Sequence, residues 1–159
     1  MDRKNPYNKI DKKINNQITK LIDNGFQQAA LGTLDINNCP FVSKAIPMVL
    51  EGRIYLLMSD LSEHARNVAN NPNVSLYFAA AEEHKTKSKN PRLSMQGKLY
   101  KLILQKDNVF FNKLLLKYSS IDFGSKLWAN FDDFNFYKFE QKRKLYVLGF
   151  GRAYQELSE

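Results

Sequence analysis

The feature that most constrains the fold is a series of β-type segments joined by very short connections. Residues 29–35 and 40–50 are separated by the polar turn 36–39, and Glu51-Gly52 precedes the aliphatic segment 53–59. Antiparallel strands can be joined by turns of this length, whereas parallel strands need a crossover of a dozen or more residues. The spacing therefore predicts hairpins in a mainly β fold and argues against doubly wound α/β order. A small barrel is the natural way to close such a sheet.

Two longer helices are expected around this series. Isoleucine and leucine recur at helical spacing from Ile10 to Ile22, and Asn24-Gly25 is a stop signal, which predicts an N-terminal amphipathic helix. A second apolar stripe predicts a helix over 105–117, and the polar residues 118–120 are expected to end it. With the strands, these helices give an α+β chain that is mainly β.

Further strands are expected in the second half of the chain. Strands are predicted over 73–80 and 92–102, the latter with a bulge at Gly97, and the Lys-rich connection 81–90 is predicted to be an exposed, disordered loop. The stretches FDDFNFYKFE and KRKLYVLGFG predict two final strands joined at Gln141-Lys142. Alternation of aromatic residues in the first stretch indicates core or dimer-interface packing.

Length and composition predict one domain over 1–159, with the helix in 1–25 and the barrel core in 26–153. The chain is 43% hydrophobic, which is enough for a core at this size. A single cysteine excludes an internal disulfide framework and a Cys-based zinc site, so no metal site is expected from cysteines. No apolar run reaches the length of about 18 residues that spans a bilayer, and the N-terminus lacks the apolar core of a signal peptide. A cytoplasmic protein without membrane contact is expected.

The basic charge leaves one alternative function open. A formal charge of +8 and a pI near 9.5 would suit a polyanion- or nucleic-acid-binding module. The lysines and arginines are scattered, however, and no run is long enough to form a basic tail. The distribution argues against nucleic acid and favours a small anionic ligand.

The segment SDLSEHARNVANN, residues 59–71, contains the strongest candidate for a binding site. Asp60, three residues before Glu63, reads as a capping box that opens a helix over Leu61–Asn70. An anion at a helix N-terminus meets free N–H groups, and hydroxyls and a guanidinium nearby add further hydrogen bonds. The side chains available for this are Ser59, Ser62, His64, Arg66 and Asn67. The alternative is that the hydroxyl and carboxylate groups only cap the helix and that the arginine is solvated.

Four stretches, in order, resemble the pyridoxamine 5′-phosphate oxidase-like FMN-binding split-barrel family, and the haem-utilisation, HugZ-like branch in particular. They are ALGTLDINNCPFVSKAIP, GRIYLLMSDLSEHARNVANNPNVSLYF, PRLSMQGK and DFNFYKFEQKRKLYVLGFGRA. The resemblance runs from about residue 29 to 153. It implies a split β-barrel homodimer that binds FMN, the small anionic cofactor, at two sites in the subunit interface.

The resemblance also implies which residues hold the flavin. The phosphate is expected near Ser59, Ser62, His64, Arg66 and Asn67, with His64 in place of the lysine of oxidase members. The isoalloxazine ring is expected along Ser43, Ala45 and Pro47, and its edge near Arg92, Ser94 and Gln96. Trp128 is assigned either to the core or dimer interface or to a position over a flavin bound by the partner subunit.

The activity implied is an FMN-dependent oxidoreductase of unknown substrate. The substrate-binding arginine and histidine of the oxidase have no match near the C-terminus, so oxidation of pyridoxamine phosphate itself is not expected, and no catalytic residue is assigned. The alternative is a haem-binding or haem-degrading iron-utilisation protein without flavin, in which His84 would be the iron ligand.

Overall fold

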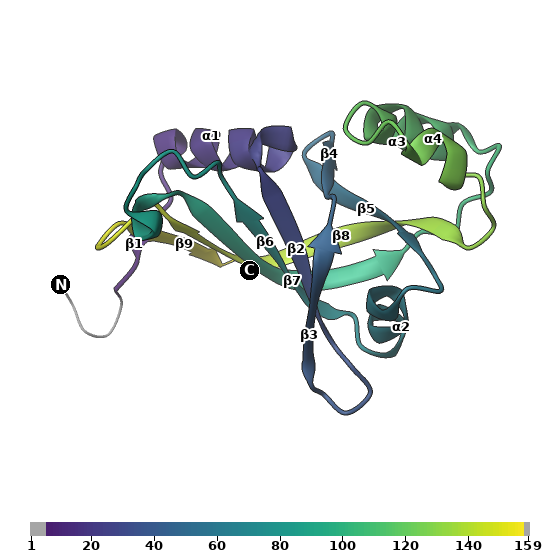
Figure 1. Cartoon of the computed structure of the whole chain (residues 1–159), viewed down its shortest axis with the longest axis horizontal. Coiled ribbons are helices and arrows are strands. Elements are labelled where there is room, and N and C mark those ends of the chain that lie inside the picture. The colour runs from purple at the N-terminus through teal and green to yellow at the C-terminus, as the bar shows by residue number, and fades with distance from the viewer. Residues whose placement is uncertain (1–5, 158–159) are drawn as a thin grey trace.

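The computed structural model describes residues 6–157 and shows a strongly curved sheet with helices packed at its ends and on one face (Figure 1). The strands are β1 (Asn8–Lys9), β2 (Gln28–Leu34), β3 (Pro40–Ala45), β4 (Met48–Leu50), β5 (Arg53–Ser59), β6 (Asn73–Ala79), β7 (Arg92–Lys101), β8 (Phe134–Val147) and β9 (Ala153–Leu157). The helices are α1 (Lys12–Lys20), α2 (Glu63–Asn70), α3 (Val109–Ser119) and α4 (Ser125–Trp128), with shorter turns η1 (Leu21–Gly25) and η2 (Lys87–Lys89). The prediction of a mainly β fold with short helices is confirmed.

The sheet is organised around the long strand β8. The strand order is β1-β9-β8-β7-β6-β2-β3, and the first half of β8 also pairs with β5, which pairs with β4. The chain passes directly from β3 to β4 through Ile46 and Pro47, yet no ladder between these strands is present among the described pairings. The sheet therefore curls like a barrel but is not closed by hydrogen bonds, in contrast to the closed barrel expected from the sequence.

Two predicted strand boundaries are wrong. The segment 40–50 forms two strands, because Ile46-Pro47 interrupts the pairing and proline cannot donate to a ladder. The predicted join at Gln141-Lys142 does not exist: β8 runs through it as one strand of 14 residues. The chain turns back only at Gly149 and Gly151, whose φ angles of 133° and 74° suit glycine.

The ladder between β7 and β8 contains one bulge. The register shifts between Gln96 and Gly97, where an irregularity was predicted, but the extra residue is Lys142 of β8, because Gln96 pairs with Arg143 and Gly97 with Gln141. A Cβ atom at Gly97 would lie 2.1 Å from the carbonyl oxygen of Glu140, so no larger residue fits against the partner strand.

Two hydrophobic clusters lie on the two faces of β5 and β8. The inner cluster fills the curl of the sheet and is covered by α1 and α2, through Ile14 and Ile18 of α1 and Val68 of α2. The outer cluster joins β5 and β8 to α3 and includes Phe136. Because β8 contributes to both clusters, its aromatic residues are buried on alternating faces, as the alternation in the sequence predicted.

The N-terminal helix and the exposed β6–β7 connection are confirmed. Asp11 caps α1, and Asn24, with a φ of 58°, ends the following turn where the stop signal was predicted. The connection 81–90 is exposed up to residue 89, and the Asn90 side chain bonds the N–H and carbonyl of His84. Within residues 6–157, no helix has the length and apolar character needed to cross a membrane.

Candidate functional site

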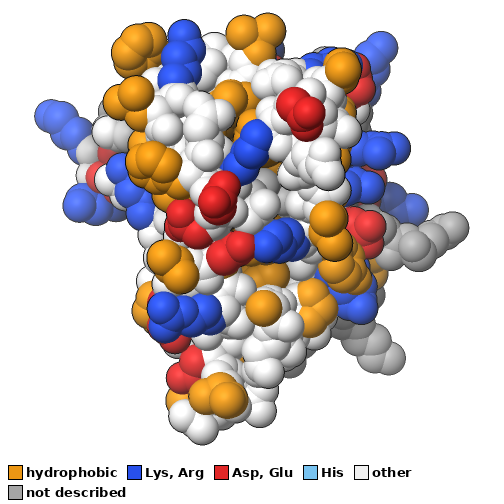
Figure 2. All heavy atoms as spheres, turned by 90° about the vertical axis from the view of Figure 1, so that its right-hand side faces the viewer, with side chains coloured by type: hydrophobic (Ala, Val, Ile, Leu, Met, Phe, Trp, Pro, Cys, Tyr) orange, Lys and Arg blue, Asp and Glu red, His pale blue; other side chains and the backbone are white. Residues whose placement is uncertain are grey.

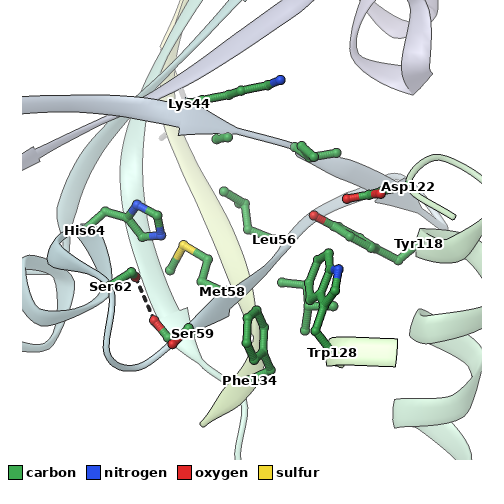
Figure 3. A pocket seen from close by; sticks show the side chains of 13 residues that line it. Lys44, Leu56, Met58, Ser59, Ser62, His64, Tyr118, Asp122, Trp128 and Phe134 are labelled. Carbon is green, nitrogen blue, oxygen red and sulfur yellow. Dashed lines mark hydrogen bonds between the residues drawn. The ribbon is translucent and has the colours of Figure 1, made fainter. Parts of the chain in front are cut away.

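A pocket of about 380 Å³ lies between the end of β5, the start of α2 and the α3–α4 segment (Figure 3). We call it the α2–α3 pocket. Its lining comprises Lys44, Ala45, Ile46, Leu56, Leu57, Met58, Ser59, Ser62, His64, Tyr118, Asp122, Trp128 and Phe134. Most of the lining surface is apolar, and the polar groups stand at its two ends. This combination of apolar walls with few polar groups is typical of sites for small molecules and cofactors.

The start of α2 forms one end of the pocket, but its cap differs from the prediction. Ser62 is the N-cap, and its hydroxyl accepts from the N–H of Ala65 at 3.4 Å and donates to the carbonyl of Ser59 at 2.6 Å. Asp60 lies outside the helix, so the predicted capping box and the helix start at Leu61 are wrong. The Asp60 carboxylate consequently does not occupy the positive end of the helix dipole.

Asp60 instead ties the end of β5 to the neighbouring strands. Its carboxylate accepts hydrogen bonds from Lys101 at 2.6 Å, Asn135 at 2.9 Å and the Tyr137 hydroxyl at 2.8 Å. Burial, followed by the hydrogen bond to Asp60, raises the pKa of Tyr137, so its hydroxyl remains a donor. Nearby, the Ser59 hydroxyl donates to the Asp133 carboxylate. These contacts fix the segment that leads into the pocket.

His64, in the first turn of α2, is the titratable group at this end of the pocket. Its Nδ1 lies 3.0 Å from the Ser43 hydroxyl of β3. Its Nε2 has no hydrogen-bond partner among the described residues. Burial lowers the pKa of His64 below the usual 6.5, so the imidazole is neutral at pH 7. A neutral imidazole with one nitrogen held and the other free is suited to bind a metal or accept a proton.

The α3–α4 segment forms the opposite end of the pocket. Tyr118 packs edge-on against Trp128, and Trp128 lies 4.8 Å from the Phe134 ring, which gives an aromatic wall. Burial, and then the charge of Asp122, raise the pKa of Tyr118, so this hydroxyl also stays protonated. In Figure 3 the Tyr118 hydroxyl and the Asp122 carboxylate lie side by side at the pocket.

Two lysines near the pocket differ in their contacts. Lys44 lies over its mouth and has no ion-pair partner in the described part of the chain. Lys106 donates to the carbonyls of Ala129 and Phe134 and so holds the segment that carries the aromatic wall. Figure 2 shows this side of the molecule, where acidic and basic side chains lie interleaved rather than gathered by sign.

The structure brings together about half of the residues predicted to hold a cofactor. Ala45, Ser59, Ser62, His64 and Trp128 line the pocket. Ser43 reaches it through its contact with His64, and Pro47 is buried directly after the lining residue Ile46.

Other predicted residues lie outside this pocket. Arg66 is exposed on α2, and the buried Asn67 side chain donates to Thr33 at 3.0 Å. The guanidinium of Arg92 bonds the carbonyls of Ser88 and Asn90, and Gln96 accepts from Arg143. Ser94 is exposed on β7. Their contacts to a flavin remain predictions.

His84 lies far from the α2–α3 pocket within one chain. It belongs to the β6–β7 connection, and Lys89 of that connection lies beside Gly149 in the β8–β9 turn. Figure 1 shows this turn at the end of the molecule away from α2, α3 and α4. The His84 Nδ1 accepts from the N–H of Thr86 at 3.1 Å. Among the described residues, no cluster of three or more His, Cys, Asp or Glu side chains could hold a metal ion.

Sequence reasoning missed Lys44, Tyr118 and Asp122. Lys44 follows Ser43 on β3, and neighbouring residues of a strand point to opposite faces, so no pattern marked Lys44 as part of a site. Tyr118 was expected to end a helix, whereas α3 includes it and buries it to 2% exposure. A helical stripe that includes residues 111, 114 and 118 would have indicated its burial.

The comparisons with known proteins agree with this geometry. The family model described as "CREG, beta-barrel" matches residues 26–156. The curated protein "Heme oxygenase HutZ" of Vibrio cholerae is 26% identical over 127 residues, which cover 79% of this chain and 71% of that protein.

Solved structures share the fold at lower identity. Campylobacter jejuni ChuZ superposes with a TM-score of 0.82 at 23% identity, covering 95% of this chain but only 62% of ChuZ. A protein of the pyridoxinephosphate oxidase family from Clostridium acetobutylicum, related to general stress protein 26, superposes with a TM-score of 0.69 at 16% identity, covering 93% and 96%. The resemblance drawn from the sequence is thus confirmed, and the chain belongs to the CREG beta-barrel family.

Proposed function

We propose that the protein binds haem in the α2–α3 pocket, with His64 as the iron ligand. The observation that carries the proposal is the state of His64, a neutral imidazole whose Nδ1 is held by Ser43 and whose Nε2 has no partner among the described residues. A hydrogen bond on one ring nitrogen fixes the tautomer and orientation that a metal ligand needs. The name of the HutZ relative supports the same ligand.

The apolar part of the remaining lining and Lys44 suit a haem group. Apolar and aromatic walls suit a flat macrocycle, and Lys44 at the mouth offers a cation to its carboxylate side chains. Asp122, which also lines the pocket, would repel these carboxylates, so they are expected near Lys44. When bound, haem would supply an iron centre whose ligand exchange and redox properties depend on the axial ligand and the polarity of the pocket.

Haemin titration of matched histidine variants tests the proposal, because the sequence contains two histidines. Haemin should give the wild-type chain a Soret band distinct from that of free haemin. His64→Ala should shift this band and lower the affinity at least tenfold, since an axial ligand is lost. His84→Ala should leave both unchanged.

Two results would overturn this assignment. A wild-type chain that gives no distinct Soret band does not bind haem as proposed. A band and affinity that change in His84→Ala but not in His64→Ala would place the iron in the β6–β7 connection. Thermal unfolding of each variant controls for loss of the fold.

FMN is the second candidate, favoured by the convergence of five predicted flavin residues on one pocket. The protein would then be a flavin-dependent oxidoreductase. The phosphate environment is less favourable than predicted, because Arg66 is exposed and the Ser59 hydroxyl is bonded to a carboxylate. Quenching of FMN fluorescence on titration with the apoprotein tests this candidate. Lys44→Ala should lower the affinity for FMN severalfold if the phosphate lies at the pocket mouth. If the protein does not quench FMN fluorescence, FMN is rejected as the ligand.

We further propose that two chains associate as a homodimer. Large apolar side chains are exposed on α3, α4 and the segments around them, including Leu116 at 75% and Phe123 at 78% exposure. Exposed apolar groups gathered on one segment are typical of an interface. Light scattering should give twice the chain mass of 18.5 kDa, and a single-chain mass at micromolar concentration would contradict the proposal.

A further inference from the structure

The α3–α4 end of the α2–α3 pocket carries two polar groups that the proposed role of His64 does not use. Tyr118 is 2% exposed, and its ring packs against Trp128 and Phe136. Its hydroxyl points toward the pocket in Figure 3. In the described part of the chain this hydroxyl has no hydrogen-bond partner. Although the ring is buried, the hydroxyl is not among the fully buried polar atoms that lack a partner, so it opens onto the pocket, where a ligand atom or water can bond to it.

Asp122 is held next to Tyr118 by the backbone. Its N–H donates to the Tyr118 carbonyl at 2.9 Å, which places the two side chains one turn apart at the end of α3. Asp122 lines the same pocket, and within residues 6–157 its carboxylate has neither an ion pair nor a hydrogen bond. The pocket wall therefore presents a free acceptor beside a free donor.

This pair restricts the kind of chemical group that fits against it. A carboxylate or phosphate is excluded because it would be repelled by Asp122. A hydrocarbon edge would leave both groups without partners. The complementary edge has an acceptor that faces Tyr118 and, next to it, a donor that faces Asp122. A cyclic amide, with a carbonyl oxygen beside an N–H, has this arrangement.

We propose that Tyr118 and Asp122 recognise a cyclic amide edge of a ligand, with Tyr118 donating to its carbonyl oxygen and Asp122 accepting from its N–H. The pyrimidine ring of a flavin and the end rings of a ring-opened tetrapyrrole both carry such an edge, whereas intact haem does not. The inference rests on the proposed function for the location of the ligand and deepens it: it assigns the residues that would recognise the edge of a flavin or of a ring-opened tetrapyrrole, and it depends on the pocket wall rather than on His64.

Riboflavin and biliverdin are the probes, because both carry the edge and riboflavin carries no phosphate. Anisotropy of riboflavin fluorescence and absorbance of biliverdin report binding. Tyr118→Phe removes one hydroxyl and keeps the ring, and it should lower the affinity for at least one probe about tenfold. Tyr146→Phe is the matched control, because Tyr146 is 4% exposed in the inner cluster, away from the pocket lining. Tyr146→Phe should leave the affinity for both probes unchanged.

A second comparison tests the role of Asp122. Riboflavin methylated at N3 lacks the N–H, so it should bind the wild-type chain more weakly than riboflavin does. Asp122→Ala should remove this difference between the two ligands if riboflavin is the responding probe. A response to biliverdin alone assigns the edge to a ring-opened tetrapyrrole.

Either of two results would overturn the inference. One is that neither probe binds the wild-type chain, and the other is that Tyr118→Phe binds both probes as tightly as the wild type does. Haemin titration of Tyr118→Phe keeps this outcome separate from the haem proposal, since haemin binding through His64 should persist. Thermal unfolding of the variants controls for the fold.

Discussion

At the scale of single residues, His64 shows how burial converts a common side chain into a candidate ligand. Its position in the first turn of α2 takes it partly out of water, and desolvation disfavours the charged imidazolium. The Ser43 hydroxyl is the hydrogen-bond partner of its ring. The result is a neutral base that faces an apolar pocket at pH 7.

The lowered pKa of His64 predicts how stability depends on pH. In the unfolded chain His64 has its usual pKa of about 6.5. In the folded chain its pKa is lower, so His64 becomes protonated only at a lower pH. The unfolded state therefore binds more protons in this window, and the free energy of unfolding should fall as the pH drops below about 6.5. Urea unfolding at pH 7.5 and pH 5.5 measures this loss, and His64→Gln should reduce it. An equal loss in both proteins would contradict the assigned pKa direction.

At the scale of elements, the start of α2 depends on two neighbouring residues with different roles. Ser62 caps the helix, whereas Asp60 joins β5 to β7 and β8 through three hydrogen bonds. β5 and β8 contribute residues to the pocket lining, and α2 carries His64, so both roles affect the site.

Alanine substitutions should separate these roles. Ser62→Ala should lower the free energy of unfolding by about 1 kcal/mol, the usual value of a helix cap. Asp60→Ala should lower it by about 2 kcal/mol, since it removes charge-assisted hydrogen bonds and leaves the Tyr137 hydroxyl without its partner. Denaturant unfolding measures both values. A larger loss in Ser62→Ala than in Asp60→Ala would contradict the role assigned to the hydrogen bonds of Asp60.

At the scale of the whole molecule, local patterns predicted the fold better than the site. Short connections between β segments, the stop signal at Asn24 and the irregularity at Gly97 each have a local cause, and the structure confirms them. The continuity of β8 was missed because Gln141 and Lys142 are polar, yet β8 pairs with β7 on both sides of the bulged Lys142. The open sheet was missed because closure of a barrel depends on how all the strands curl together, which no local pattern encodes.

The site illustrates the same limit. The serines and His64 were predicted because they cluster in one segment, and they do line one pocket. Tyr118 and Asp122 reach that pocket only because α3 folds across β5 and β8, so no nearby motif marks them. Arg66 was predicted to contact the phosphate because it lies near the start of the helix in sequence, but its side chain is exposed on α2.

A crystal structure of the protein grown with haemin would show directly whether the α2–α3 pocket binds haem. We expect a macrocycle in this pocket, the iron bonded to Nε2 of His64 and the carboxylates near Lys44. Iron bonded to another residue, or haem bound outside this pocket, would contradict it.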